Sequence, residues 1–158
     1  MANKIISMKA LKDSIVEKLQ ISRNKSIHTL FPKTTEELIE MIGDEIKKNG
    51  TECSLNHIDV SEITDMSNLF YKSEFNGDIS KWDVSKVENM QFMFAYSKFT
   101  GKNGDINNWD ISNVDVMYKM FYHSDFNSNI ADWNCEDKDA RYMLIACPIA
   151  SKFSPKWI

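Results

Sequence analysis

The chain has 158 residues, of which 42% are hydrophobic and 27% are charged, so it is too apolar for a disordered chain and too polar for a membrane protein. This length suits one domain with a core of its own. The three cysteines show no C-x-x-C spacing, which argues against a disulfide framework and a zinc site. No apolar run approaches the roughly 18 residues of a membrane span.

Charge is distributed unevenly along the chain. Residues 59–139 carry 7 basic and 15 acidic side chains, a net charge of −8. An acidic segment repels nucleic-acid phosphates, so we expect no direct DNA or RNA binding. The start of the chain shows no secretory leader, so we expect a cytoplasmic protein, or a surface protein if a leader has been removed.

Residues 1–54 do not repeat and are predicted to form an N-terminal helical cap. A first amphipathic stripe comprises Met8, Leu11, Ile15 and Leu19. A second helix should begin at a capping box formed by Thr34 and Glu37 and stop at Gly50. Its apolar face comprises Leu38, Met41, Ile42 and Ile46. The alternative is that the first helix binds a partner separately.

Residues 55–158 contain an internal repeat that the tryptophans mark. Trp82, Trp109, Trp133 and Trp157 are separated by 27, 24 and 24 residues. The second repeat has three extra residues near positions 101–103, which we assign to a surface loop. A unit of about 24 residues cannot bury its own apolar side, so it must stack on its neighbours. We therefore predict a solenoid of about four repeats.

The spacing of the apolar residues changes within each repeat unit. Met66, Leu69 and Phe70 have helical spacing, whereas residues 79–84 read as a short extended strand. The predicted fold class is therefore an α/β repeat, with one short strand and one short helix in each coil of about 24 residues. The strands should stack as a narrow parallel sheet with a spacing of roughly 4.8 Å.

The repeated pattern W-D-V-S-x-V-x-x-M-x-x-M-F, followed by F-N-x-D-I-S-x-W, resembles the BspA-like leucine-rich-repeat family of bacterial surface proteins over residues 55–157. The resemblance implies a leucine-rich-repeat-like solenoid that makes protein contacts. Proteins of that family are commonly secreted or lipid-anchored surface proteins, so the resemblance also implies a role in adhesion to hosts or to other cells.

Large aromatic side chains interrupt the repeat at positions that other repeats fill with small or polar residues. We predict a contact patch at Phe92, Tyr96, Tyr118 and Tyr122, because aromatic residues dominate interface hot spots. Acids are expected around it at Glu88, Asp115 and Asp125. The alternative is that these rings merely cover the helix layer or the loop at 101–104.

Enzyme and metal sites are not predicted. The three histidines occupy different places in the repeat, and no hydrolase, metalloprotease or phosphate-loop motif is present. Columns of Asp and Asn, such as Asp83 and Asp110, fit local turn hydrogen bonds better than a calcium ladder. We therefore expect no catalytic residue, no metal and no cofactor.

Three functions remain open from the sequence. The leading hypothesis is a non-enzymatic protein-interaction module with a protein partner. The second is a small intracellular inhibitor or decoy, encoded for instance by a mobile element, whose acidic surface occludes a nucleic-acid-binding site. The third is a fragment of a surface adhesin. The fourth coil has no cap after it, which allows a homodimer through that coil.

Overall fold

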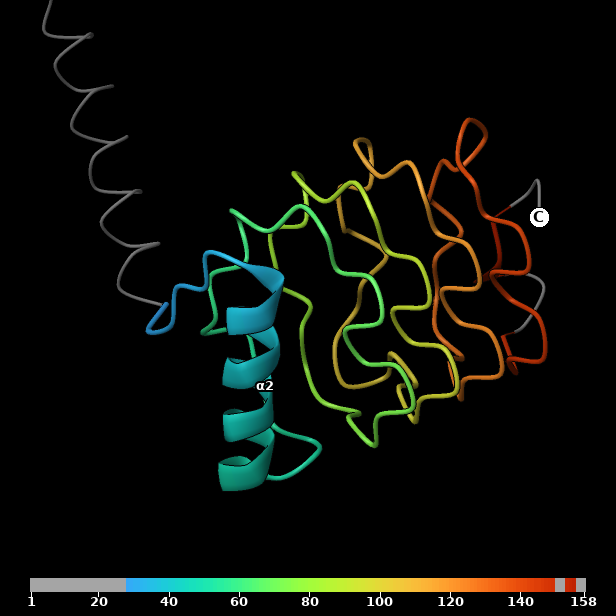
Figure 1. Cartoon of the computed structure of the whole chain (residues 1–158). Helices are drawn as coiled ribbons and strands as arrows, with labels where there is room; N and C mark the ends of the chain where they lie inside the picture. Colours follow the sequence, from blue (N-terminus) through green and yellow to red (C-terminus); the bar gives the residue numbers. More distant parts are fainter. Residues whose placement is uncertain (1–27, 150–152, 156–158) are drawn as a thin grey trace, which may run out of the picture.

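The computed structural model describes residues 28–149 and 153–155, and Figure 1 shows one helix beside a stack of turn-rich coils. The helix, α2, spans Thr35–Asn49. The first predicted stripe, at positions 8–19, lies outside the described residues. No helix in the described part of the chain is long and apolar enough to cross a membrane.

The second predicted helix is confirmed, together with its ends. Thr34 is the N-cap, and its side chain accepts a hydrogen bond from the backbone N–H of Glu37. The carboxylate of Glu37 in turn accepts from the backbone N–H of Lys33 at 2.7 Å. At the other end Gly50 adopts a φ of 87° and donates its N–H to the carbonyl of Ile46, as helix-ending glycines do.

The predicted α/β solenoid is wrong. In the described residues α2 is the single helix, and the coils contain only isolated parallel bridges in place of a sheet. One row of these bridges joins Asp65 to Asn89, Asn89 to Val116, and Val116 to Asp139. Successive repeats therefore lie side by side, but each coil is built from turns rather than from a strand and a helix.

The hydrogen bonds explain why the helical spacing did not produce a helix. Every second backbone N–H in residues 66–73 makes a hydrogen bond that closes a turn within its own coil. The N–H of Leu69, for example, donates to the carbonyl of Met66. The N–H groups between them donate to carbonyls of the next coil. The N–H of Phe70, for example, donates to the carbonyl of Met93 at 2.8 Å. In an α-helix all these donors would point along the axis. Here half of them hold the stack together.

Left-handed residues recur every four positions in this run of turns. Asn68 and Lys72 have φ values of 60° and 56°. The equivalent residues of the later coils share the feature: Phe92, Tyr96, Lys119, His123, Tyr142 and Ala146. A turn closed by an i to i+3 bond with positive φ at its third residue resembles a type II turn. We call residues 66–73 and their equivalents in the later coils the tandem-turn run.

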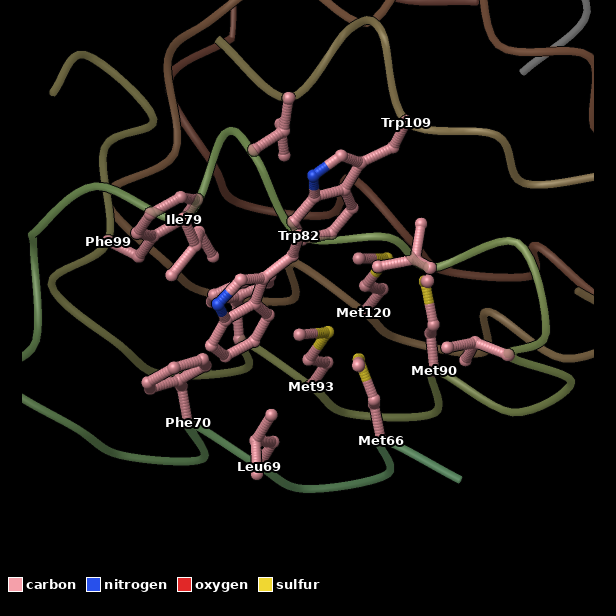
Figure 2. Close-up of a cluster of buried hydrophobic side chains, with 14 of the residues drawn as sticks. Met66, Leu69, Phe70, Ile79, Trp82, Met90, Met93, Phe99, Trp109 and Met120 are labelled. Atoms are coloured by element: carbon pink, nitrogen blue, oxygen red, sulfur yellow. The ribbon is translucent and has the colours of Figure 1, made fainter. Parts of the chain in front are cut away.

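In the core, side chains at equivalent positions of the repeat stack from coil to coil. The rings of Phe70, Phe94 and Phe121 are nearly parallel, with centroids 5.3 and 5.4 Å apart. Figure 2 shows Phe70 in one buried cluster with methionines and tryptophans of successive coils. Because Phe94 lies between the rings of the coil before it and the coil after it, no coil can bury its apolar side alone.

Helix α2 packs against the first coil, at the end of the stack opposite the last coil (Figure 1). Leu38 and Ile42 are buried in the common core. Thr35 Oγ1 donates to the carbonyl of Asp65 at 2.7 Å, and Glu45 pairs with His57 at 3.3 Å. These contacts fix α2 against the coils, while the domain boundary at residue 54 stays a prediction.

Candidate protein-binding surface

The tandem-turn runs place a continuous set of aromatic rings on the surface. We call this set the aromatic face, and its members are Tyr71, Phe92, Tyr96, Tyr118, Tyr122 and Tyr142. Neighbouring coils join through edge-to-face contacts, such as Phe92 with Tyr118 at 5.5 Å and Tyr96 with Tyr122 at 5.6 Å. Rings packed edge to face are attracted beyond their buried area, so these contacts hold the rings of the face against one another.

Two lysines lie among these rings. The ammonium of Lys119 is 4.8 to 5.7 Å from four ring centroids, those of Phe92, Tyr118, Tyr122 and Tyr142. Lys72 lies 5.1 Å from the ring of Tyr71 and 5.9 Å from that of Tyr96. Such cation–π contacts hold the long side chains against the rings.

Three tyrosines of the aromatic face are well exposed. Tyr71, Tyr96 and Tyr142 are 39%, 45% and 56% exposed. Within the described part of the chain, none of the five tyrosine hydroxyls of the face makes a hydrogen bond. The face therefore offers apolar ring edges and unpaired hydroxyl groups together.

The structure brings the four predicted aromatic residues together. The sequence prediction omitted Tyr71 and Tyr142, although both lie in the same repeat columns as chosen residues. It also omitted the cations Lys72 and Lys119. The repeat alignment pointed to Lys119, because Lys119 shares a column with Phe92. Sequence spacing does not show, however, that the ammonium of Lys119 would lie over aromatic rings.

The three predicted acids make other contacts. Asp125 pairs with Lys98 at 3.3 Å. Glu88 and Asp115 line a groove of about 520 Å³ that also includes Lys86. In the described residues no ion pair links these acids to Lys72 or Lys119. Their part in partner binding stays a prediction.

A second groove, of about 450 Å³, contains four aspartates, Asp110, Asp115, Asp132 and Asp137. Lys138 also lines it, but its ammonium donates to the carbonyls of Ser112 and Val114 at 3.0 and 2.7 Å. In the described part of the chain no three His, Cys, Asp or Glu side chains are placed to hold a metal ion.

The aspartate columns form local turns, as expected. The backbone N–H of Ser85 donates to Asp83 at 3.1 Å, and that of Ser112 donates to Asp110 at 3.0 Å. The hydrogen bonds from the side chain and backbone of Ser112 hold the pKa of Asp110 below its usual value. These carboxylates thus have a structural role in shaping the coil.

The cysteines and histidines do not converge. All three cysteines are free thiols, and burial raises the pKa of Cys135 to about 12, which keeps this thiol protonated. His28 lies 3.7 Å from Asp59, whereas His123 stacks on Tyr96.

Comparison with known proteins identifies the family. A family model described as "Mycoplasma protein of unknown function, DUF285" matches residues 36–157. The chain belongs to this family. The DUF285 match covers most of α2 as well as the coils, so the helix and the repeats belong to one family unit. Searches of curated proteins and of solved structures found no match, and membership of the BspA-like family is not confirmed.

Proposed function

We propose that this DUF285 chain is a non-enzymatic protein-interaction module that binds another protein through the aromatic face. The observation that carries the proposal is the set of six surface rings on four successive coils, five of them tyrosines whose hydroxyls make no hydrogen bond among the described residues. Tyrosine supplies large contact area and a polar group at low entropic cost. The resemblance of the repeats to BspA-like surface proteins supports a role in protein contact.

The arrangement of the rings favours a protein over a ligand that stacks on flat aromatic platforms. Contacts between neighbouring coils are close to perpendicular, from 76° for Tyr96 with Tyr122 to 89° for Tyr71 with Tyr96. The edges of neighbouring rings and the ammonium of Lys119 therefore occupy ring faces that a nucleic-acid base or a sugar would need. Tyr71, Tyr96 and Tyr142 nevertheless stay 39% to 56% exposed.

Hydrogen bonds hold the backbone beneath the face in place. Every tandem-turn run is hydrogen-bonded within its own coil, and the first three runs also donate to the next coil. A preorganised surface loses little conformational entropy when it binds, so more of the contact energy appears as affinity. A few central rings should then carry most of that affinity.

The test is affinity capture from cells of the source organism and of its host, with identification of bound proteins by mass spectrometry. The variant combines Phe92→Ala, Tyr96→Ala, Tyr118→Ala and Tyr122→Ala. A matched control combines alanines at four exposed positions away from the rings: Lys81, Lys102, Asn108 and Glu136. We expect the wild type and the control to capture the same protein and the aromatic variant to lose it, provided that circular dichroism shows all three folded.

Tyrosine-to-phenylalanine changes separate the rings from their hydroxyls. Tyr96→Phe, Tyr118→Phe and Tyr122→Phe together should weaken binding less than the alanine variant does, because ring contacts remain. Capture that survives all aromatic changes and is released by high salt would overturn the proposal and support an acidic inhibitor. Binding only to intact cell surfaces, independent of the rings, would support an adhesin.

A further inference from the structure

The hydrogen bonds between coils run in one direction along the tandem-turn runs. The N–H groups of Lys119, Phe121 and His123 donate to the carbonyls of Arg141, Met143 and Ile145, at 3.1, 3.0 and 2.9 Å. The two earlier pairs of coils follow the same rule. On this part of its edge, each coil therefore receives bonds from the coil before it and donates bonds to the coil after it.

Within residues 28–149 and 153–155, no coil follows the last tandem-turn run to receive its donors. In the described residues, the N–H groups of Tyr142, Leu144 and Ala146 have no acceptor. Beside them is a groove of about 390 Å³ with a mainly apolar lining, which includes Leu144, Ile145 and Ile149. Ile145 is 49% exposed. Unpaired donors beside apolar surface are the features of an edge that pairs with another chain.

The direction of the donors decides what fits this edge. A second copy related by a two-fold axis would set N–H groups against N–H groups, so that arrangement makes no bonds. A second copy stacked head to tail would need its first coil free to offer carbonyls. Helix α2 covers that end, with Leu38 and Ile42 buried and Thr35 bonded to the carbonyl of Asp65.

We propose that the open edge of the last coil binds a coil of the same repeat type, carried by another polypeptide whose first coil is not covered by a helix. The partner coil runs parallel to residues 140–146 and offers carbonyls at alternate positions. Its apolar residues, at the spacing of Met117, Met120 and Phe121, fill the groove and continue the stacked core. This edge is a different surface from the aromatic face, apart from Tyr142, which belongs to both.

Amide hydrogen exchange of the full chain, measured by NMR at a concentration where it is monomeric, tests the donors directly. We expect the amides of Tyr142, Leu144 and Ala146 to exchange at least about tenfold faster than their counterparts in the previous coil, Lys119 and Phe121, because they lack acceptors. Equal protection of the two sets in the monomer would overturn the proposal, since the edge would already be covered by the chain itself.

A second experiment supplies the missing partner from the same sequence. Leu38→Asp with Ile42→Asp should release α2 from the first coil and uncover its carbonyls. We expect this variant to form head-to-tail assemblies in sedimentation velocity. Wild-type protein can join at one end only, so an excess of it should shorten the assemblies to dimers and slow the exchange of its own Tyr142, Leu144 and Ala146 amides.

The control for this experiment blocks the edge. Adding Ile145→Asp, at an exposed position of the groove, to the α2 variant should abolish assembly, whereas adding Lys102→Asp, on an exposed loop, should not. Assemblies that persist with Ile145→Asp, or that wild type does not shorten, would be aggregates of another kind and would overturn the proposal. A folded α2 variant that stays monomeric at high concentration would do the same.

Discussion

Trp109 differs from the tryptophans above and below it in one hydrogen bond. The indole N–H groups of Trp82 and Trp133 donate to the carbonyls of Leu55 and Ile106, at 3.0 and 3.2 Å. The indole N–H of Trp109 is buried and has no partner in the described part of the chain. The coil that ends at Trp109 is the one with three extra residues.

This difference predicts unequal costs for the same substitution. Trp82→Phe removes one of two hydrogen bonds to the carbonyl of Leu55, which still accepts the backbone N–H of Ile58 at 3.0 Å, whereas Trp109→Phe removes an unpaired donor. We expect Trp82→Phe to lower the free energy of unfolding by about 0.5–1.5 kcal/mol more than Trp109→Phe does. Urea denaturation followed by circular dichroism measures both. Equal losses would show that the hydrogen bond contributes nothing.

Backbone strain is a second feature of single residues. Ala146 has a φ of 55°, a conformation that costs an alanine about 1–2 kcal/mol relative to glycine. Glycine also gains entropy in the unfolded chain, which offsets up to about 1 kcal/mol. We expect Ala146→Gly to raise the free energy of unfolding by about 0.5 kcal/mol. The control, Ala131→Gly, lies outside the left-handed region and should lower it by a similar amount.

The elements of this fold are turns, and carboxylates organise many of them. Asp78 accepts the backbone N–H of Ser80 at 2.9 Å. Burial raises the pKa of Asp78, but its hydrogen bonds with Ser80 and Asn56 outweigh burial and lower it below the ordinary 3.8. A lowered pKa in the folded state means that ionised Asp78 stabilises the fold above about pH 4, and that this contribution is lost as the pH falls through the lowered value.

Substitution at Asp78 separates charge from turn geometry. Asp78→Asn keeps the acceptor oxygen, as Asn129 does in the same column, where it accepts the N–H of Ala131 at 3.0 Å. We expect Asp78→Asn to be less stable than the wild type at pH 7, because it lacks the ionised carboxylate, and to match the wild type near pH 2, so that it loses less stability between pH 4 and pH 2. Asp78→Ala should cost about 1 kcal/mol at pH 7. Thermal unfolding across this pH range measures both variants.

At the scale of elements, the sequence predicts helix α2 correctly but not the turns of the coils. The signals for α2 are local, because Thr34, Glu37 and Gly50 act within one turn of the helix ends. The spacing of Met66, Leu69 and Phe70 fits both a helix and a run of turns. The choice between them depends on whether the N–H groups bond along the chain or to a neighbouring coil, which is not a local property.

At the scale of the whole molecule, stability depends on stacking. Phe94 is fully buried between Phe70 and Phe121, whereas Phe92, two residues earlier, belongs to the aromatic face. We expect Phe94→Ala to lower the free energy of unfolding by about 3–5 kcal/mol and Phe92→Ala to cost much less. Urea denaturation measures both, and similar costs would mean that the aromatic face, and not the stack, holds the coils together.

Much of this architecture follows from the sequence alone. The repeat, the identity of the core columns and the ends of α2 are set by apolar periodicity and by short-range hydrogen bonds, which are properties of the chain itself. The four predicted surface aromatics also lie together, because a repeat column becomes a row when coils stack.

Only the tertiary structure decided the form of the coil and the composition of the face. Half of the N–H groups in each of the first three tandem-turn runs bond to the next coil, so turns replace the helix and isolated bridges replace the sheet. The same stacking brings the ammonium of Lys119 over rings from three coils. Both outcomes depend on groups about 24 residues or more apart in sequence, whose partners exist only once the coils are in contact.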